Sequence, residues 1–314
     1  MRFYGRDLDM SCTKPLPAFE YICPSTGLKA VSLKQVPGRE PNLQIPCRKC
    51  PSCKLRKAKE WGLRCWHESQ MHEENAFITL TYAPEHLPHY ECLDHRDFQL
   101  FMKRFRKAYP DRKVKYFMCG EYGDGTHRPH YHVILFGYFP LDAVYHRTEN
   151  GNRFYKSEEL DAFWKKGFTD TSGVSYNSAG YVARYALKKQ LPKEELQERY
   201  SYIDYDGNAQ IRPFEYVKMS TGRKKWDGIG ASWFREYAAQ TVTHDYVLDP
   251  KGNQCPVPKY YLDILKYDDP NWYEKLARER IEKAKANPDN TPDRLRQKAI
   301  CTEARLKQLP RPYL

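Results

Sequence analysis

The sequence lacks the long apolar runs and the nucleotide-binding motif that would place it in two large classes of protein. None of its apolar stretches approaches the roughly 18 consecutive residues needed to span a bilayer. The first ten residues, MRFYGRDLDM, contain no apolar segment typical of a secretory signal peptide. The phosphate-binding pattern G-x4-G-K-S/T is also missing, so we expect no helicase domain. These absences predict a cytoplasmic protein with no membrane partner.

Acidic residues are outnumbered by basic ones in this chain of 314 residues. Lys and Arg together number 52, against 40 for Asp and Glu, which gives a net charge of +12. Aromatic residues reach 14%, with 25 tyrosines among them. Lysine and arginine bind phosphates and bases stack on aromatic rings, so the composition favours a nucleic-acid partner over a basic protein without one. The length suits one large domain or two smaller ones.

The stretch from Tyr116 to Gly137 predicts a β-hairpin with a metal site near its turn. Its second half, HYHVILF, is dense in the β-branched and aromatic residues that favour strands. Side chains alternate between the faces of a strand, so His130 and His132 share one face and Tyr131 takes the other. Two imidazoles placed in this way can converge on one divalent metal ion. Such a pair also arises by chance among ten histidines, so neighbouring features have to support it.

A carboxylate at the end of the preceding strand completes the predicted ligand set. That strand begins near Val114 and ends in GEYGDG, whose glycines and aspartate indicate a turn. Folding back at this turn would bring Glu121 beside the two histidines. One carboxylate and two imidazoles with open positions suit Mg²⁺ or Mn²⁺ and phosphate chemistry. The prediction depends on the pairing register, because a slip of one residue sends Glu121 to the opposite face.

Cysteines with the spacing C-x2-C-x2-C-x11-C form a second candidate metal site, for zinc. They are Cys47, Cys50, Cys53 and Cys65, and the basic residues around them favour the thiolate form. Short C-x2-C steps let backbone turns present thiolates to one tetrahedral zinc ion. The usual second C-x2-C pair is missing, so the fourth ligand has to be Cys65, Cys12, Cys23 or a histidine such as His67. The alternative is a set of free cysteines, with Cys65 a core residue of a helix over residues 54–72.

The stretch SAGYVARYALKKQ predicts a helix that carries two tyrosines on one face. Ser178 is the expected N-cap, and the helix should extend to about Lys189. Tyr181 and Tyr185 lie one turn apart, Lys188 falls between them in angle, and small apolar residues line the opposite face. A tyrosine hydroxyl can attack phosphorus in a diester that a metal polarises, and a nearby cation stabilises the phosphate charge. Alternatively, both tyrosines are packing residues of an amphipathic helix.

Other stretches predict the elements that surround these motifs. Residues 1–46 are expected to form an irregular arm with one hairpin, and Phe77–Tyr82 a β-strand. Periodicity predicts helices over residues 97–108, 157–165, 272–286 and 293–308. The first of these has a phenylalanine-rich face for packing and a basic face, which is more often solvated than bound to DNA.

Three motifs, in order along the chain, resemble those of the HUH rolling-circle replication initiators. They are FITLTY, CGEYGDGTHRPHYHVILFG and YVARYALKK. The resemblance is closer to the replication initiation proteins of gokushovirus-type microviruses, which are small phages with single-stranded DNA. It extends to SCTKP, CRKCPSCKLRKAKEW, FMKRFRK, GIGASWFREY and VPKYYLDIL, and therefore spans most of the chain.

The resemblance implies an α+β fold, in which an antiparallel sheet of four or five strands has flanking helices. It divides the chain into a Cys-rich basic N-terminal segment over residues 1–72, an HUH endonuclease core over residues 73–190, and a partly helical extension over residues 191–314. The core is expected to hold the chemistry, and the N-terminal segment the zinc ion.

The resemblance also implies roles for individual residues of the core. His130 and His132 match the histidine pair of the family, and Glu121 matches the third metal ligand of many members. Tyr181 and Tyr185 match the paired nucleophiles of the two-tyrosine branch. The remaining assignments are Lys188 beside the tyrosines and, for DNA contacts, Arg128, Arg184 and Lys189.

The implied activity is site-specific nicking of the phage double-stranded replicative form at its origin, where the DNA is locally single-stranded. Attack by one tyrosine gives a 5′-phosphotyrosine and a free 3′-OH, which a host polymerase extends with the help of a host helicase. The other tyrosine cuts the regenerated origin, and the unit-length circle is rejoined. Mg²⁺ or Mn²⁺ is the expected cofactor, with structural Zn²⁺ at the cysteines.

Two other functions fit parts of the sequence. A non-catalytic, zinc-dependent nucleic-acid-binding protein would need Cys47, Cys50 and Cys53 but not His130. A plasmid initiator, a mobilisation relaxase or a transposase would keep the chemistry in a different biological setting. The sequence leaves open the oligomeric state, the origin sequence and which tyrosine cuts first.

Overall fold

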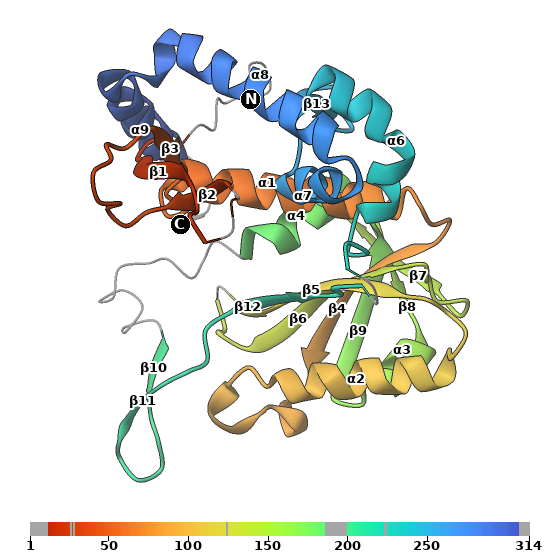
Figure 1. Cartoon of the computed structure of the whole chain (residues 1–314). Helices are drawn as coiled ribbons and strands as arrows, with labels where there is room; N and C mark the ends of the chain where they lie inside the picture. The colour runs from red at the N-terminus through yellow and green to blue at the C-terminus, as the bar shows by residue number, and fades with distance from the viewer. Residues whose placement is uncertain are drawn as a thin grey trace. The chain divides into compact units, whose positions relative to one another are not determined.

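The computed structural model describes residues 12–25, 27, 29–123, 125–185, 200–222 and 225–307. Two compact units are present, one formed by the chain up to Lys57 together with the chain from Glu274 onward, and the other by Ala58–Tyr273. Within the described residues, no helix is long and apolar enough to cross a membrane. Figure 1 shows the elements of both units.

The larger unit is built on one antiparallel sheet of seven strands, in the order β12-β5-β6-β4-β9-β8-β7. The four central strands, β5, β6, β4 and β9, bury residues either alternately or continuously. β-branched and aromatic side chains fit such buried positions in a sheet. The strands are β4 (Asn75–Tyr82), β5 (Lys115–Tyr122), β6 (Pro129–Phe136), β7 (Val144–Glu149), β8 (Asn152–Lys156), β9 (Gly167–Gly173) and β12 (Tyr216–Met219).

The α+β class and the antiparallel sheet are confirmed, but the sheet is larger than the four or five strands expected. The additional strands have weak sequence signals. β7 leaves nearly all its side chains exposed, so its sequence shows no buried apolar face. β12 has only four residues and lies beyond residue 190, outside the core expected from the sequence, yet it pairs with β5.

One face of the sheet packs on an aromatic core beneath α2 (His95–Ala108) and α3 (Glu158–Trp164). The phenylalanines of α2 lie on a single stripe, and Phe98, Phe101 and Phe105 are all buried against strand residues. Figure 1 shows both helices on the same side of the sheet. The helix predicted over residues 97–108 therefore forms, with its apolar face inward.

The other face of the sheet packs against α4 (Tyr176–Tyr185) and the part of α1 (Pro51–Ser69) that follows Ala58. Ala179 and Val182 of α4 are fully buried with strand residues. A Cβ added to Gly62 of α1 would lie 3.5 Å from the Cα of Gly180 in α4, so two glycines meet where these helices approach each other. The small apolar side of α4 is thus its packing face, as its sequence predicts.

The helix α4 begins earlier than its sequence suggested. Ser175 Oγ accepts a hydrogen bond from the N–H of Ser178 (3.1 Å), and Ser178 Oγ accepts one from the N–H of Ser175 (2.8 Å). This reciprocal pair is a capping box with Ser175 as the N-cap. The prediction that Ser178 caps the helix is wrong, because two serines three residues apart compete for that position and the earlier one takes it.

Two further helices and a hairpin attach to α1 in the same unit. They are α6 (Ala231–His244), α7 (Lys259–Asp268) and the pair β13 (Tyr246–Leu248) and β14 (Gln254–Pro256). The guanidinium of Arg64 lies 3.9 Å from the ring centre of Trp61 and 3.8 Å from that of Tyr260. Its Nε donates to the carbonyl of Ile229 (3.0 Å), so one buried cation joins α1 to the C-terminal half of the unit.

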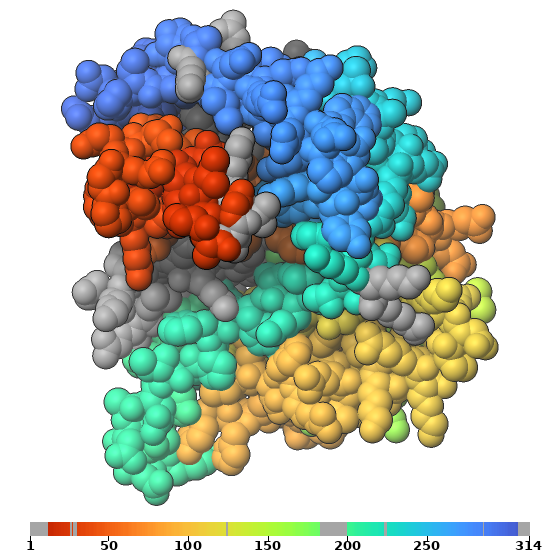
Figure 2. All heavy atoms as spheres, viewed as in Figure 1, coloured from red at the N-terminus to blue at the C-terminus, as the bar shows by residue number. Residues whose placement is uncertain are grey.

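The hairpin of β10 (Ser201–Ile203) and β11 (Ala209–Ile211) projects from the rest of this unit, as the green-blue segment at the lower left of Figures 1 and 2 shows. Its apolar side chains, including Ile203 and Ile211, are exposed. A two-stranded hairpin of this kind has little burial of its own to stabilise it. One short 3-10 helix packs aromatic rings against it, since Tyr90 of η2 (His89–Glu91) lies close to Tyr202.

The smaller unit contains a three-stranded antiparallel sheet in the order β2-β1-β3, together with α9 (Pro292–Lys307) and most of α8 (Pro270–Ala286). Its strands are β1 (Leu16–Ile22), β2 (Lys29–Ser32) and β3 (Leu43–Ile45). The N-terminal arm is therefore more regular than the single hairpin expected, because β1 pairs on both sides with short, mostly exposed strands.

A buried carboxylate, Glu68 of α1, connects this helix to β5 and to the residue before α6 within the larger unit. It accepts a hydrogen bond from the N–H of Gly230 (2.6 Å) and lies 2.9 Å from Lys115 Nζ and 3.0 Å from His72 Nε2. Burial opposes ionisation, but the bond from His72 and the charge of Lys115 outweigh it and lower the pKa of Glu68. The ionised carboxylate therefore stabilises the fold.

We predict that Glu68→Gln lowers the free energy of unfolding by about 3 kcal/mol, because it leaves the Lys115 charge without its partner. The pKa of Glu68 is lower in the folded state, so this contribution is complete at neutral pH and is lost as the pH falls through the folded pKa. Urea denaturation at pH 7 measures the difference. The control is Glu85→Gln, at an exposed position. Equal effects of the two substitutions would contradict the prediction.

Candidate active site

The pairing of β5 with β6 decides which side chains meet. Glu121 stands directly opposite His130, and Cys119 opposite His132. Residues opposite one another in an antiparallel pair point to the same face of the sheet. Glu121 and both histidines therefore share the face that α4 covers, which is the register that the predicted ligand set required.

The three side chains form one tight cluster. Glu121 Oε1 lies 2.6 Å from His130 Nε2 and 3.1 Å from His132 Nε2. Their possible ligand atoms all lie within 4.8 Å of one another, so this group could hold a metal ion. Glu121 is only 3% exposed, and its Oε2 is buried without a hydrogen-bond partner among the described residues. A buried carboxylate oxygen without a partner is costly unless something else binds it, and a cation would do so.

The carboxylate is ionised in this setting, as a metal ligand must be. Burial alone would raise the pKa of Glu121. Hydrogen bonds from His130 and His132, together with their positive charge when protonated, outweigh burial and hold the pKa well below its usual value. Glu121 therefore carries its negative charge throughout the neutral range.

Both imidazoles are oriented through their second nitrogen. His130 Nδ1 lies 3.2 Å from the carbonyl of Arg128, which can only accept a hydrogen bond, so Nδ1 donates to it. His132 Nδ1 lies 3.0 Å from Thr79 Oγ1 on β4. In each ring Nε2 is left facing Glu121, which is the arrangement of metal-binding histidines held by partners behind them.

Thr79 was not singled out from the sequence. The predicted strand Phe77–Tyr82 contains it, but only the observed register shows that it pairs directly with His132. A threonine within a clean strand looks like an ordinary strand residue. The sequence showed only that Thr79 lies in a strand. It did not show that this strand pairs with the strand of the two histidines, or that Thr79 lies opposite His132.

Tyr181 reaches this cluster from α4. Its hydroxyl donates to Glu121 Oε1 (3.2 Å), and its ring centre lies 5.1 Å from that of His132, nearly perpendicular to it. The buried side of α4 fixes this orientation by packing on β5, β6 and β12. A phenol oxygen, a carboxylate and two imidazoles are thus brought together at one point of the sheet.

The other predicted residues of this helix are described only in part. Tyr185 is the last residue of α4, one turn beyond Tyr181, but its side chain lies outside the described residues, as does that of Arg184. Lys188 and Lys189 lie entirely outside them. Their assigned roles remain predictions.

Arg128 and Tyr131 take definite places beside the cluster. Arg128 Nη2 donates to the carbonyl of Tyr82 (3.0 Å), so this half-buried side chain joins the start of β6 to the end of β4. Tyr131 points to the opposite face, as predicted, where it is fully buried and its hydroxyl donates to the carbonyl of Asp94 (2.6 Å). The aromatic residue between the histidines therefore anchors the strand in the core.

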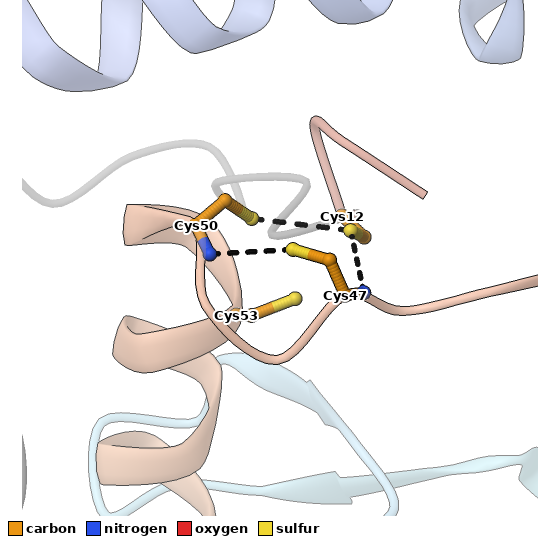
Figure 3. A group of neighbouring side chains, drawn as sticks. All are labelled: Cys12, Cys47, Cys50 and Cys53. Carbon is orange, nitrogen blue, oxygen red and sulfur yellow. Dashed lines mark hydrogen bonds between the residues drawn. The ribbon is translucent and has the colours of Figure 1, made fainter. Parts of the chain in front are cut away.

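The cysteines gather differently from the predicted set. Cys12, Cys47, Cys50 and Cys53 have sulfur atoms within 4.8 Å of one another, and this group could hold a metal ion (Figure 3). Burial opposes ionisation of Cys50, but hydrogen bonds from the Cys53 backbone and from Thr13 lower its pKa to about 6.

Cys65 does not belong to this cysteine group, so its assignment as the fourth ligand is wrong. It lies about three turns beyond Cys53 along α1 and is fully buried with Phe117 and Ile134 of the sheet. Of the alternatives, Cys12 lies in the group and completes it, whereas Cys23 contacts Ser25 and His67 stacks on Trp233.

Known proteins match the part of the chain that holds the Glu121 cluster. The family model of the replication-associated protein ORF2 matches residues 75–190, which include β4, the β5–β6 hairpin and α4. No solved structure gives a significant match.

Three curated phage proteins are similar over most of the chain. Replication-associated protein VP4 of Bdellovibrio phage phiMH2K is 36% identical over 283 residues, which are 87% of this chain and 83% of the relative. Replication-associated protein ORF2 of Spiroplasma virus 4 is 34% identical over 234 residues, 70% of this chain and 67% of the relative. Replication-associated protein ORF4 of Chlamydia phage 1 is 30% identical over 235 residues, 71% of this chain and 53% of the relative.

We predict that Thr79→Val weakens Mn²⁺ binding by about ten- to a hundredfold, because His132 loses the partner that orients its ring. Calorimetric titration with Mn²⁺ measures the affinity, and this ion has little preference for the thiolates of the cysteine group. Thr81→Val is the matched control, since Thr81 lies on the same strand and face but donates to the carbonyl of Phe168. Equal losses in the two variants would contradict the role of Thr79.

Proposed function

The chain belongs to the replication-associated proteins of the microviruses, and on that basis we propose that it initiates phage DNA replication by cutting one strand with a tyrosine. The observation that carries this proposal is the hydrogen bond from the Tyr181 hydroxyl to Glu121, a carboxylate also bonded to His130 and His132. A nucleophile beside a metal-binding group is the minimum that such a reaction needs. The likeness of three motifs to HUH initiators supports the same chemistry.

The residues present fit a divalent metal ion. Glu121, His130 and His132 would hold it through one carboxylate and the two Nε2 atoms. Mg²⁺ or Mn²⁺ suits such a set, and when bound it polarises the scissile phosphate and offsets its negative charge. Oε2 of Glu121, which has no hydrogen-bond partner among the described residues, supplies a further oxygen on the same side chain.

The Tyr181 oxygen is the nucleophile in this proposal. It forms a bond to phosphorus as the bond from phosphorus to the 3′ oxygen breaks, so the 5′ phosphate stays on the tyrosine. The phenol gives up its proton and the departing 3′ oxygen takes one, which leaves a free 3′-OH. Before attack, the hydrogen bond to Glu121 holds the phenol oxygen beside the candidate metal ligands.

The second tyrosine completes a replication cycle in this proposal. Tyr185 follows one turn later on α4, and it cuts the origin when a host polymerase, assisted by a host helicase, has regenerated it. The new 3′-OH then attacks the first phosphotyrosine, so the phosphodiester re-forms and the unit-length circle closes. Lys188 stabilises charge on the phosphate, and Arg128, Arg184 and Lys189 contact the DNA backbone.

The division of the chain follows from this assignment. We assign the nuclease chemistry to residues 73–190, and the strand β12, from the following part of the chain, extends their sheet beside β5. Residues 1–72 supply the cysteine group, and residues 191–314 a partly helical extension. The net charge of +12 is consistent with single-stranded and replicative-form phage DNA as the partners.

Two alternatives remain useful as outcomes of experiment. A non-catalytic nucleic-acid-binding protein would depend on the cysteines and not on His130. A plasmid initiator, relaxase or transposase would share the chemistry, but the similar proteins are all from phages, which favours the phage initiator.

We predict that the chain forms a covalent adduct with labelled single-stranded origin DNA in the presence of Mn²⁺, visible on a denaturing gel. The adduct should be lost after chelation, in His132→Ala, and in the double variant Tyr181→Phe with Tyr185→Phe. Tyr176→Phe should keep it, because this tyrosine of α4 packs beside Leu63.

Persistence of the adduct in the double variant would rule out these tyrosines as nucleophiles. DNA binding without any adduct, across several origin fragments and both metals, would favour the binding-module function instead.

A further inference from the structure

Three separate segments of the smaller unit bring their cysteines to one point. Cys12 precedes β1, Cys47 follows β3, Cys50 immediately precedes α1 and Cys53 lies in the first turn of α1. Figure 3 shows the four sulfur atoms turned toward one another between the N-terminal segment and the first turns of the helix. The segment of the chain that forms the sheet β2-β1-β3 therefore begins and ends next to these four thiols.

The spacing of the sulfur atoms matches a single tetrahedral ion. Bonds of about 2.3 Å from zinc to sulfur place the sulfur atoms of a tetrahedral site about 3.8 Å apart. The Sγ atoms of Cys12 and Cys50 are 3.9 Å apart, and all four lie within 4.8 Å. A disulfide would need about 2.05 Å, and these cysteines form none. A cluster of several irons needs a wider opening, because the metal atoms themselves separate the thiolates.

Backbone N–H groups already point at the sulfur atoms. The N–H of Cys47 donates to Cys12 Sγ (3.2 Å), and those of Lys49 and Cys50 donate to Cys47 Sγ (3.4 and 3.3 Å). Hydrogen bonds of this kind favour the thiolate, which is the form that binds metal. The turn between Cys47 and Cys50 is tight enough to hold Arg48 at φ 61°, in the left-handed region.

Positive charge surrounds the group on the side of α1. Four thiolates and one divalent ion leave a net charge of −2, which needs compensation. Arg48 and Lys49 are exposed next to the ligands, and the half-buried Lys54 directly follows Cys53 in α1. The sequence supplies these cations within the same short stretch as three of the four cysteines.

Among the described residues, the three-stranded sheet buries few apolar side chains of its own. Of its strand residues, Ala18 and Phe19 are buried, whereas Ile22 and Val31 remain exposed, as does Leu33 just beyond β2. Within the described part of the chain, the cysteine group forms a cluster of its own, without an aliphatic or aromatic member. The unit also buries Leu276, Leu295 and Leu306 of α8 and α9, but a small sheet with so few buried apolar residues is commonly stabilised by a disulfide or a metal ion.

We propose that Cys12, Cys47, Cys50 and Cys53 bind one structural zinc ion, which fastens the three-stranded sheet to the start of α1. Binding exchanges the remaining thiol protons for four Zn–S bonds, without any change in oxidation state. The site is closed, since all four positions are protein thiolates, so the ion supplies stability and not a reactive water. This inference goes beyond the nuclease proposal and does not depend on it.

The test uses the full-length chain and two readouts of the metal. Elemental analysis after dialysis should give one zinc per chain. Replacement by Co²⁺ should give the intense thiolate-to-cobalt charge-transfer absorption of a tetrahedral thiolate site. His132→Ala should keep that absorption, which distinguishes this site from the Glu121 cluster even if no DNA adduct ever forms.

Variants of single cysteines locate the ligands. Cys12→Ser should lose the zinc and the charge-transfer band, whereas Cys12→His, which restores a metal ligand, should recover zinc. Cys23→Ser is the matched control in the same segment and should behave as wild type, as should Cys65→Ala if it folds. Removing zinc from the wild type with a strong chelator should increase proteolytic cleavage within residues 12–57, and added zinc should reverse it.

Three results would overturn the proposal. They are wild-type protein without zinc and without a cobalt–thiolate band, a Cys12→Ser variant that retains both, and iron in place of zinc in the purified chain.

Discussion

The alignment of Glu121 opposite His130 is the constraint on which the candidate site depends. Side chains of a strand alternate between faces, so a shift of one residue would turn Glu121 toward the aromatic core beneath α2. A carboxylate there would be buried among phenylalanine and tyrosine rings, at a cost of several kcal/mol. Tyr131 supports the same alignment from the other side, because its buried hydroxyl donates to the carbonyl of Asp94 and also contacts the Tyr82 hydroxyl.

The two faces of the sheet differ in the side chains that they bury. The face beneath α2 and α3 packs on a large cluster of aromatic and aliphatic side chains, beside which the buried Asp97 accepts a hydrogen bond from the Tyr82 hydroxyl. On the side of α1 and α4, the buried carboxylates Glu68 and Glu121 each contact neighbours of opposite charge or histidines. Glu68 uses its hydrogen bonds to join α1 to the loop before α6, whereas Glu121 keeps one oxygen without a partner among the described residues. Glu121 is therefore the carboxylate suited to a ligand.

Local pattern predicted the elements and the shared face of the histidines, because strand alternation and helical stripes are properties of neighbouring residues. The sequence could not fix which residues stand opposite one another, so Thr79 went unrecognised although it contacts His132. The same limit led to Cys65 in place of Cys12, since the thiol nearest in sequence lies in the core and a distant one completes the group. Short exposed strands such as β7 lacked an apolar face and were missed.

The central claim is that one register of the hairpin builds a metal site beside a tyrosine nucleophile. Anomalous diffraction from crystals of the chain with Mn²⁺ tests it most directly. The account predicts a manganese peak bound by Nε2 of His130 and His132 and by Glu121, with the Tyr181 hydroxyl next to it. Manganese absent from these three side chains at saturating concentration, or bound only elsewhere on the chain, would contradict it.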